Sequence, residues 1–295
     1  MRAVGIILAG GNNNRMKELT HKRAVAAMPI AGSYRSIDFA LSNMTNSHIQ
    51  KVAVLTQYNA RSLNEHLNSS KWWNFGRKQG GLYVFTPTIT NDNGYWYRGT
   101  ADAIYQNMDF LKKSHEPYVV IASGDAVYKM DYSKVLQYHI DKKADVTVVC
   151  KEMDPSDDVS RFGTIRMDDD MRITEFEEKP MVTKSNMIST GIYVIRRRLL
   201  IDLIEHAAEE ERFDFVNDVL IRYKNLKKIY GYKIDHYWSN IATVDAYYKT
   251  NMDFLKPEVR NYFFKQDPEI YSKVSDLPPA KYNPGASVKN SLVGS

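Results

Sequence analysis

Four short, almost wholly apolar runs place the strongest constraint on what this chain can fold into. They are AVGIILA (3–9), KVAVLTQ (51–57), YVVIASGD (118–125) and DVTVVCKEM (145–153). Strands without polar alternation are typical of sheets that are buried on both faces. Helical segments separate or follow them, at 40–49, 61–70, 99–114 and 132–144. This alternation predicts an α/β fold, with a Rossmann-like, mostly parallel mixed sheet covered by helices.

The second half of the chain has a different pattern. Residues 162–178 read as a strand, an acidic turn and a second strand, and residues 189–197 read as a further strand that leads into a helix. These elements predict an antiparallel extension beside the parallel strands. A helix at 246–256 is expected to close a first domain that spans residues 1–256.

The remaining residues, 257–295, are rich in proline and glycine and end in ASVKNSLVGS. Small and apolar residues recur there about six positions apart, as in the hexapeptide coils of β-helices. A single coil cannot bury its own face, because about three repeats are usually needed. Two interpretations stay open, an ordinary C-terminal loop or a linker and first coil of a β-helix. The pattern favours the second.

Composition excludes several classes of protein. The net charge of +5 is spread along the chain, which argues against a nucleic-acid partner. The single cysteine, Cys150, cannot form an internal disulfide, which suits a reducing cytosol. No run approaches the roughly 20 apolar residues that span a bilayer, and the first apolar run ends too early for a signal peptide. We expect a cytoplasmic protein without a membrane partner.

A glycine pair follows the first strand, in the segment Gly10-Gly11-Asn12-Asn13-Asn14-Arg15. Paired glycines allow backbone N–H groups to approach a phosphate closely, and an arginine adds positive charge. Asparagine tolerates the left-handed conformations of such a turn, but its side chain fills space that glycine leaves open. The segment therefore predicts a modified phosphate-binding loop.

Further motifs follow in a fixed order. They are RAVAAM (23–28), YRGTADA (97–103), SGDAVYKMDY (123–132), FEEKP (176–180), STGIYV (189–194) and YWSNIATVDAYY (237–248). In this order and spacing, residues 1–256 strongly resemble glucose-1-phosphate adenylyltransferase (ADP-glucose pyrophosphorylase) of bacterial glycogen synthesis. The resemblance implies a nucleotidyltransferase domain followed by a left-handed β-helix, of which residues 257–295 would be the start.

The resemblance also implies a reaction and its catalytic groups. ATP and glucose 1-phosphate would give ADP-glucose and diphosphate, which requires cationic clamps and a divalent metal. Arg15 and Asp125 match catalytic positions of the family, and Asp125 would hold Mg²⁺. The second metal-binding aspartate is replaced by Asn240, and the lysine of the family's RAKPAV motif is replaced by Val25. These two positions are therefore degenerate.

Binding residues are carried over in the same way. Seven positions match the family's nucleotide side: Gly10, Gly11, Gln57, Tyr97, Gly99, Thr100 and Asp102. Five positions match its sugar-phosphate side: Glu178, Lys179, Ser189, Gly191 and Asp214. An ammonium group such as that of Lys179 is a suitable donor to a phosphate. The sugar side is thus better preserved than the catalytic positions.

Three hypotheses follow. The leading one is a regulatory, catalytically impaired subunit that modulates a catalytic partner subunit in a tetramer, with glucose 1-phosphate, ATP or other sugar phosphates as ligands or effectors. Its basis is the combination of retained motifs with Val25, Asn240 and the asparagine loop. The alternative is an active adenylyltransferase in which Asp125 and another carboxylate suffice. The third is a sugar-phosphate sensor that acts without an enzyme partner.

Overall fold

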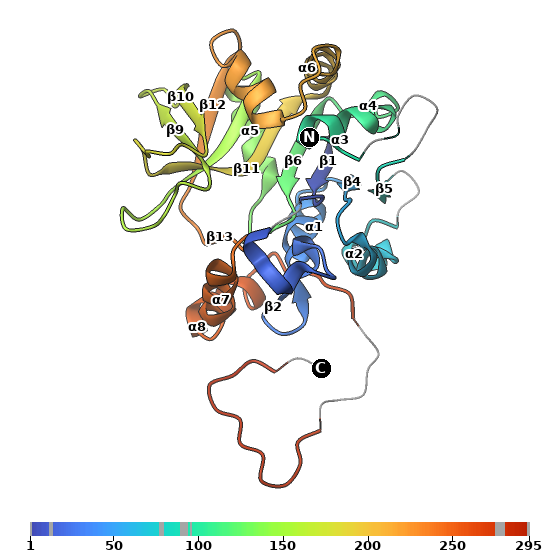
Figure 1. Ribbon diagram of the computed structural model, residues 1–295, viewed down its shortest axis with the longest axis vertical. Helices are drawn as coiled ribbons and strands as arrows, with labels where there is room; N and C mark the ends of the chain where they lie inside the picture. Colours follow the sequence, from blue (N-terminus) through green and yellow to red (C-terminus); the bar gives the residue numbers. More distant parts are fainter. Residues whose placement is uncertain are drawn as a thin grey trace.

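A mixed sheet of nine strands forms the centre of the part of the chain that the structure describes, residues 2–11, 14–76, 80–88, 94, 96–274 and 281–293 (Figure 1). In this computed structural model the strands are β1 (Ala3–Leu8), β4 (Lys51–Leu55), β5 (Gly81–Phe85), β6 (Tyr118–Ser123), β8 (Val146–Glu152), β9 (Gly163–Met167), β10 (Ile173–Glu178), β11 (Met187–Arg196) and β12 (Ile229–Ile234). Strands β5, β4, β1, β6, β8 and β12 all run in one direction, and β11 runs against them. The predicted Rossmann-like, mostly parallel mixed sheet is confirmed.

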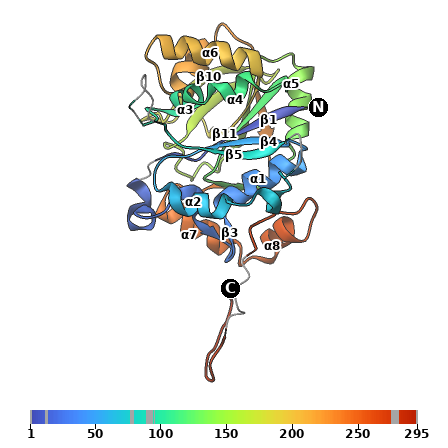
Figure 2. The same ribbon diagram turned by 90° about the vertical axis from the view of Figure 1, so that its right-hand side faces the viewer.

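The apolar runs are buried on both faces, as expected. In β1, Val4 and Ile6 face one apolar cluster, whereas Ala3 and Ile7 face another. Helices α3, α4 and α6 contribute to the first cluster and helices α1, α2 and α5 to the second. Figure 2 shows α3, α4 and α6 on one side of the sheet and α1 and α2 on the other. The apolar runs of the sequence were therefore sufficient to predict which strands form the central, doubly covered part of the sheet.

The helices that cover the sheet are α1 (Ser36–Asn46), α2 (Ala60–Leu67), α3 (Thr100–Gln106), α4 (Met108–Lys112), α5 (Tyr132–Asp141) and α6 (Arg197–Glu209). The single helix expected over 99–114 is wrong in one respect, because the chain breaks at Asn107. The Asn107 amide donates to the Tyr97 hydroxyl (2.9 Å) and to the Ala103 carbonyl (2.8 Å), and these bonds end α3. None of the helices that the structure describes is both long enough and apolar enough to cross a membrane.

Strand β11 changes partners along its length. β8 lies along one edge, while the other edge pairs with β9 near Ile188 and with β6 from Tyr193 onward. The register shifts between Ser189 and Tyr193, and Gly191 within this bulge has a φ of +74°, in the left-handed region that favours glycine. The sheet therefore divides at the bulge, where the hairpin β9–β10 and β6 take different parts of the same edge of β11. The hairpin is the antiparallel extension that the second-half pattern predicted.

Two further helices, α7 (Val244–Asp253) and α8 (Pro257–Phe264), pack below the sheet, together with the short strand pairs β2 (Pro29–Ile30) with β3 (Tyr34–Arg35) and β7 (Ala126–Tyr128) with β13 (Trp238–Asn240). Phe254 and Phe263 are fully buried against Phe39. The chain then returns to α1, where Tyr271 N–H donates to Ser42 Oγ (2.8 Å). Packed structure thus continues past residue 256, the predicted end of the first domain.

The described tail, residues 281–293, is exposed throughout and contains no helix or strand. Its sequence repeat is the basis of the predicted β-helix, which remains a prediction.

Candidate functional site

The carboxyl ends of three parallel strands open into a cavity of about 690 Å³. Leu8 of β1, Leu55 of β4 and Ser123 of β6 line it, and Gly191 reaches it from the bulge in β11. Ligands of open α/β sheets bind at this end of the strands, where the connections turn back. Twelve of the residues predicted from sequence line this one cavity: Gly10, Gly11, Arg15, Val25, Gln57, Tyr97, Gly99, Thr100, Asp125, Lys179, Gly191 and Asn240.

The charge of the described lining is strongly asymmetric. Arg15, Arg98, Arg161 and Lys179 contribute cations, whereas Asp125 is the only carboxylate among these lining residues. Guanidinium and ammonium groups are strong donors to phosphate oxygens, and a cleft lined by one sign of charge attracts the opposite sign. The cavity is therefore suited to a phosphorylated ligand.

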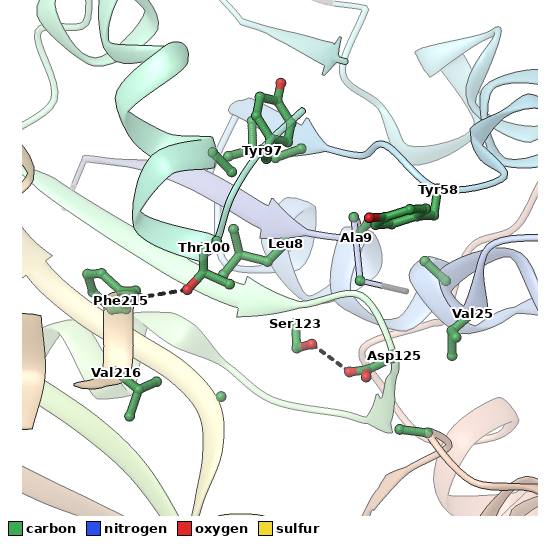
Figure 3. A pocket seen from close by; sticks show the side chains of 18 of the residues that line it. Leu8, Ala9, Val25, Tyr58, Tyr97, Thr100, Ser123, Asp125, Phe215 and Val216 are labelled. Carbon is green, nitrogen blue, oxygen red and sulfur yellow. Dashed lines mark hydrogen bonds between the residues drawn. The ribbon is translucent and has the colours of Figure 1, made fainter. Parts of the chain in front are cut away.

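The wall on the predicted nucleotide side depends on backbone clamps. The Gln57 amide accepts from Tyr97 N–H (2.9 Å) and donates to the Tyr97 carbonyl (3.2 Å). Thr100 Oγ1 accepts from Phe215 N–H (2.9 Å), a contact visible at one end of the cavity in Figure 3. Asp125 and Val25 lie at the other end. Gln57 and Thr100 thus hold two chain segments together as well as lining the cavity.

Four predicted residues do not line the cavity. Asp102 is almost fully buried and accepts from Arg98 N–H (2.8 Å), which fixes the start of α3. Glu178 pairs with Lys179 Nζ (3.0 Å). Ser189 is buried against the Tyr193 hydroxyl (3.2 Å), and Asp214 accepts from Asn217 N–H (2.7 Å) at the start of a helical turn. Their contacts support the residues beside them, and their predicted role in binding remains a prediction.

The two positions predicted to hold a metal are brought together by β7 and β13. Asn240 pairs with Ala126, and Ile241 N–H donates to the Asp125 carbonyl (2.9 Å). The Asp125 carboxylate accepts from the Ser123 hydroxyl (2.5 Å). Sequence positions more than a hundred residues apart therefore meet at one end of the cavity, as the resemblance implies.

The protein side chains at this end of the cavity offer few ligands to Mg²⁺. The Asn240 Oδ1 atom accepts from Ala242 N–H (3.0 Å) and lies 3.4 Å from Arg161 Nη1, so its lone pairs are engaged. Mg²⁺ requires near-octahedral oxygen ligands and is usually held by one or two carboxylates together with phosphate oxygens of the substrate. Asp125 is the one carboxylate in this part of the lining, and the described residues contain no cluster of three His, Cys, Asp or Glu side chains. Without a phosphate ligand, a cation at this end of the cavity would therefore have a single carboxylate, that of Asp125, to hold it.

Comparison with known proteins shows the family to which the chain belongs. The profile of the nucleotidyl transferase family matches residues 4–257. A glucose-1-phosphate adenylyltransferase of Thermosipho melanesiensis is 39% identical over 292 residues, which cover 98% of this chain and 71% of the relative. Its counterpart in Clostridium novyi is 40% identical over 98% of this chain and 76% of the relative. The chain belongs to the glucose-1-phosphate adenylyltransferase family.

Solved structures agree on the fold. A crystal structure described as a glucose-1-phosphate thymidylyltransferase of Bacillus anthracis superposes with a TM-score of 0.67, covering 85% of this chain and 94% of that one. Its sequence identity is 21%, so this likeness concerns the fold alone. The nucleotidyltransferase fold, first predicted from apolar runs and motifs, is thereby supported from a second direction.

Within this adenylyltransferase-family fold, Val25 has an apolar role. It begins a short 3-10 helix, Val25–Ala27, is 7% exposed, and belongs to the apolar cluster that contains Met16 and Ile241. A lysine at this position would present its ammonium group to the cavity, whereas valine completes the cluster. Asn14 is exposed and begins the 3-10 helix Asn14–Thr20, which precedes Val25 in the chain. Asn12 and Asn13 lie outside the described residues.

Sequence reasoning missed several lining residues, chiefly Arg98, Arg161, Tyr58, Phe215 and Val216. Arg98 lies within the YRGTADA motif, and its guanidinium stacks on Phe213 at 3.8 Å. Arg161 directly precedes the strand predicted from residue 162, where a charged residue at a strand entrance was the available signal. Phe215 and Val216 carry no such signal, because they reach the cavity only through the tertiary fold.

Proposed function

We propose that this chain is a regulatory subunit of glucose-1-phosphate adenylyltransferase that is itself catalytically impaired and modulates a catalytic partner subunit in glycogen synthesis. One observation carries the proposal. Val25 and Asn240 line the same charged cavity at the positions where the family resemblance implies a lysine and an aspartate. The binding cavity is retained, while two groups that would act on phosphates and metal are replaced by neutral side chains.

The size of the expected defect follows from electrostatics. A unit charge about 4 Å from its partner contributes about 4 kcal/mol at an effective dielectric constant near 20. Loss of one metal-binding carboxylate would therefore slow a metal-assisted transfer by about a thousandfold. The side-chain oxygen of Asn240 would increase this loss of rate, because its hydrogen bonds leave no lone pair to offer a metal. The two replacements need not add, since catalytic groups act as a unit.

The remaining parts of the proposal concern ligands and assembly. Arg15 and Lys179 support binding of ATP, glucose 1-phosphate or other sugar phosphates as ligands or effectors. A tetramer with the catalytic subunit, a cytoplasmic location and a left-handed β-helix that begins in the exposed tail complete the hypothesis. The relatives support this family context, since the chain spans 71–78% of the length of the adenylyltransferases that it matches.

An assay of ADP-glucose formation tests the proposal. The chain would be measured with Mg²⁺, ATP and glucose 1-phosphate, alone and with a catalytic adenylyltransferase subunit from the same source. We expect no turnover alone, a changed rate or effector response of the partner, and a gain of activity in the Val25→Lys, Asn240→Asp double variant. Val182→Lys, on an exposed residue, is the control for added charge. Ordinary turnover by the unchanged chain would contradict the regulatory role.

One observation favours the alternative, an active adenylyltransferase. Arg15, Asp125 and Lys179 line a single cavity of about 690 Å³, which is large enough for a small-molecule ligand. Under this hypothesis the unchanged chain forms ADP-glucose in proportion to Mg²⁺, and Asp125→Asn abolishes the activity. Absence of turnover by the unchanged chain would exclude this second function.

A further inference from the structure

Arg161 occupies the end of the cavity where Asp125 and Asn240 meet. Its guanidinium stacks on Phe162 at 4.5 Å, and its two terminal nitrogens lie 3.4 Å from the side-chain oxygen and the backbone carbonyl of Asn240. Burial lowers the pKa of Arg161, while the nearby carboxylates of Asp125 and Asp158 raise it. An arginine remains charged at any ordinary pH. A fixed positive charge therefore stands beside the degenerate metal position.

The groups that Arg161 contacts directly are neutral, and the carboxylates of Asp125 and Asp158 act on it from farther away. Within the described residues, no carboxylate oxygen lies within 4.0 Å of its guanidinium nitrogens, whereas Lys179 and Arg98 each have such a partner, Glu178 and Asp102 respectively. An aspartate at position 240 would form an ion pair with Arg161 in the same geometry. Asparagine preserves the hydrogen bonds and leaves the positive charge uncompensated by contact. The guanidinium of Arg161 is therefore available to pair with an anionic ligand in the cavity.

We propose that Arg161, positioned by Asn240, takes the place of the divalent cation in this cavity, so that the chain binds the phosphate groups of its ligand without metal. A guanidinium offers a planar fork of donors that matches phosphate oxygens, and it requires no carboxylates to hold it. Arg15 and Lys179 line the same cavity and add to the positive charge. The inference rests on the proposed function for the identity of the cavity as a nucleotide and sugar-phosphate site.

Isothermal titration of the chain with ATP tests the inference directly. The titration is run once in EDTA and once in excess Mg²⁺. We expect affinities in the two conditions that agree within about threefold, since the protein supplies the cation. Arg161→Ala is expected to weaken binding in EDTA by about 10- to 100-fold, the range for loss of a charge-assisted contact. The affinity of Arg161→Lys is expected to lie between those of the unchanged chain and Arg161→Ala, because lysine keeps the charge and loses the planar fork of donors.

Asn240→Asp provides a second, independent variant. It replaces the side-chain NH2 group by an oxygen atom and keeps the contacts to Arg161 and to Ala242 N–H. We expect it to weaken ATP binding in EDTA by about tenfold, because the new carboxylate neutralises Arg161, and to make binding respond to Mg²⁺. A purely structural role of Asn240 would leave the response to Mg²⁺ unchanged. Arg61→Ala is the matched control, since Arg61 is 93% exposed on α2 and outside the cavity.

Three results would overturn the inference: ATP binding that is lost in EDTA and restored by Mg²⁺, no ATP binding in either condition, or an unchanged affinity in correctly folded Arg161→Ala. The regulatory role is measured separately, by the rate of the catalytic partner. Metal-free binding without any effect on the partner would contradict only the proposed function. Metal-dependent binding with an effect on the partner would contradict only the role of Arg161.

Discussion

Replacement of Gly99 by alanine is expected to destabilise the fold through a collision with Phe213. Gly99 has an extended backbone (φ −178°, ψ −176°), a conformation that any residue adopts. A Cβ atom at this position would lie 2.3 Å from the Phe213 carbonyl oxygen and 2.7 Å from its carbon. The glycine is therefore required by the close approach of two backbones, in addition to any contact with a nucleotide.

The magnitude follows from the bonds that the collision would break. The Phe213 carbonyl accepts from Ala101 N–H (2.8 Å) and from Asp102 N–H (3.3 Å), and these bonds join the start of α3 to the segment that precedes Phe215. Relief of the collision requires a movement of about 1 Å, and each buried group left unsatisfied costs about 1–3 kcal/mol. Reduced freedom of the unfolded chain returns about 0.4–1 kcal/mol. With two such groups, the net loss is about 1–5 kcal/mol, centred on about 3 kcal/mol.

Urea unfolding of Gly99→Ala measures this loss as a lower midpoint with an unchanged slope. Gly11→Ala is the control, because nothing lies within 4 Å of a Cβ at that position. It should stay within about 0.5 kcal/mol of the unchanged chain, as surface substitutions do. A Gly99→Ala variant as stable as the Gly11→Ala control would refute the reasoning, and Gly99 would then be a residue kept for ligand contact alone.

Three further outcomes are expected. Burial lowers the pKa of His139 to about 4, with Arg196 contributing, from 6.5 in the unfolded chain. Because the unfolded chain takes up the proton first, stability should fall by about 3 kcal/mol as the pH drops from about 6.5 to about 4. Urea midpoints measured across this range, for the unchanged chain and for His139→Gln, give the slope of stability against pH. Equal slopes would exclude His139 as the cause. Lys179→Met removes a partly solvated phosphate donor and should weaken glucose 1-phosphate binding by about tenfold in titration calorimetry, with Lys184→Met, outside the cavity, unaffected. Trp73→Phe removes the indole bond to the Tyr271 carbonyl (3.1 Å), so limited proteolysis near residues 269–274 should accelerate and stability should fall by about 1 kcal/mol. Proteolysis at the original rate would mean that the other bonds of this segment, those of Ser42, Asn46 and Asp38 among them, are sufficient to hold it.

Much of the candidate site was predictable because its residues lie at the carboxyl ends of predicted strands. Gly10 follows β1, Gln57 follows β4 and Asp125 follows β6. Parallel strands place these ends at one edge of the sheet, so their convergence follows from topology. The four predicted residues outside the cavity lining show the limit of this reasoning. Asp102 shares a motif with Gly99 and Thr100, but its carboxylate is buried in the first turn of α3 and accepts from Arg98 N–H.

Patterns of side-chain chemistry determined the layers of this protein by themselves. Continuous apolar runs must be buried on both faces, and a glycine pair after the first strand permits a tight turn, whatever else the chain does. The tertiary structure decided which polar groups face one another. Gln57 reaches Tyr97 40 residues away, and Arg161 reaches Asn240 79 residues away. A hydrogen bond of about 3 Å depends on the relative placement of whole elements, and no local pattern encodes that placement.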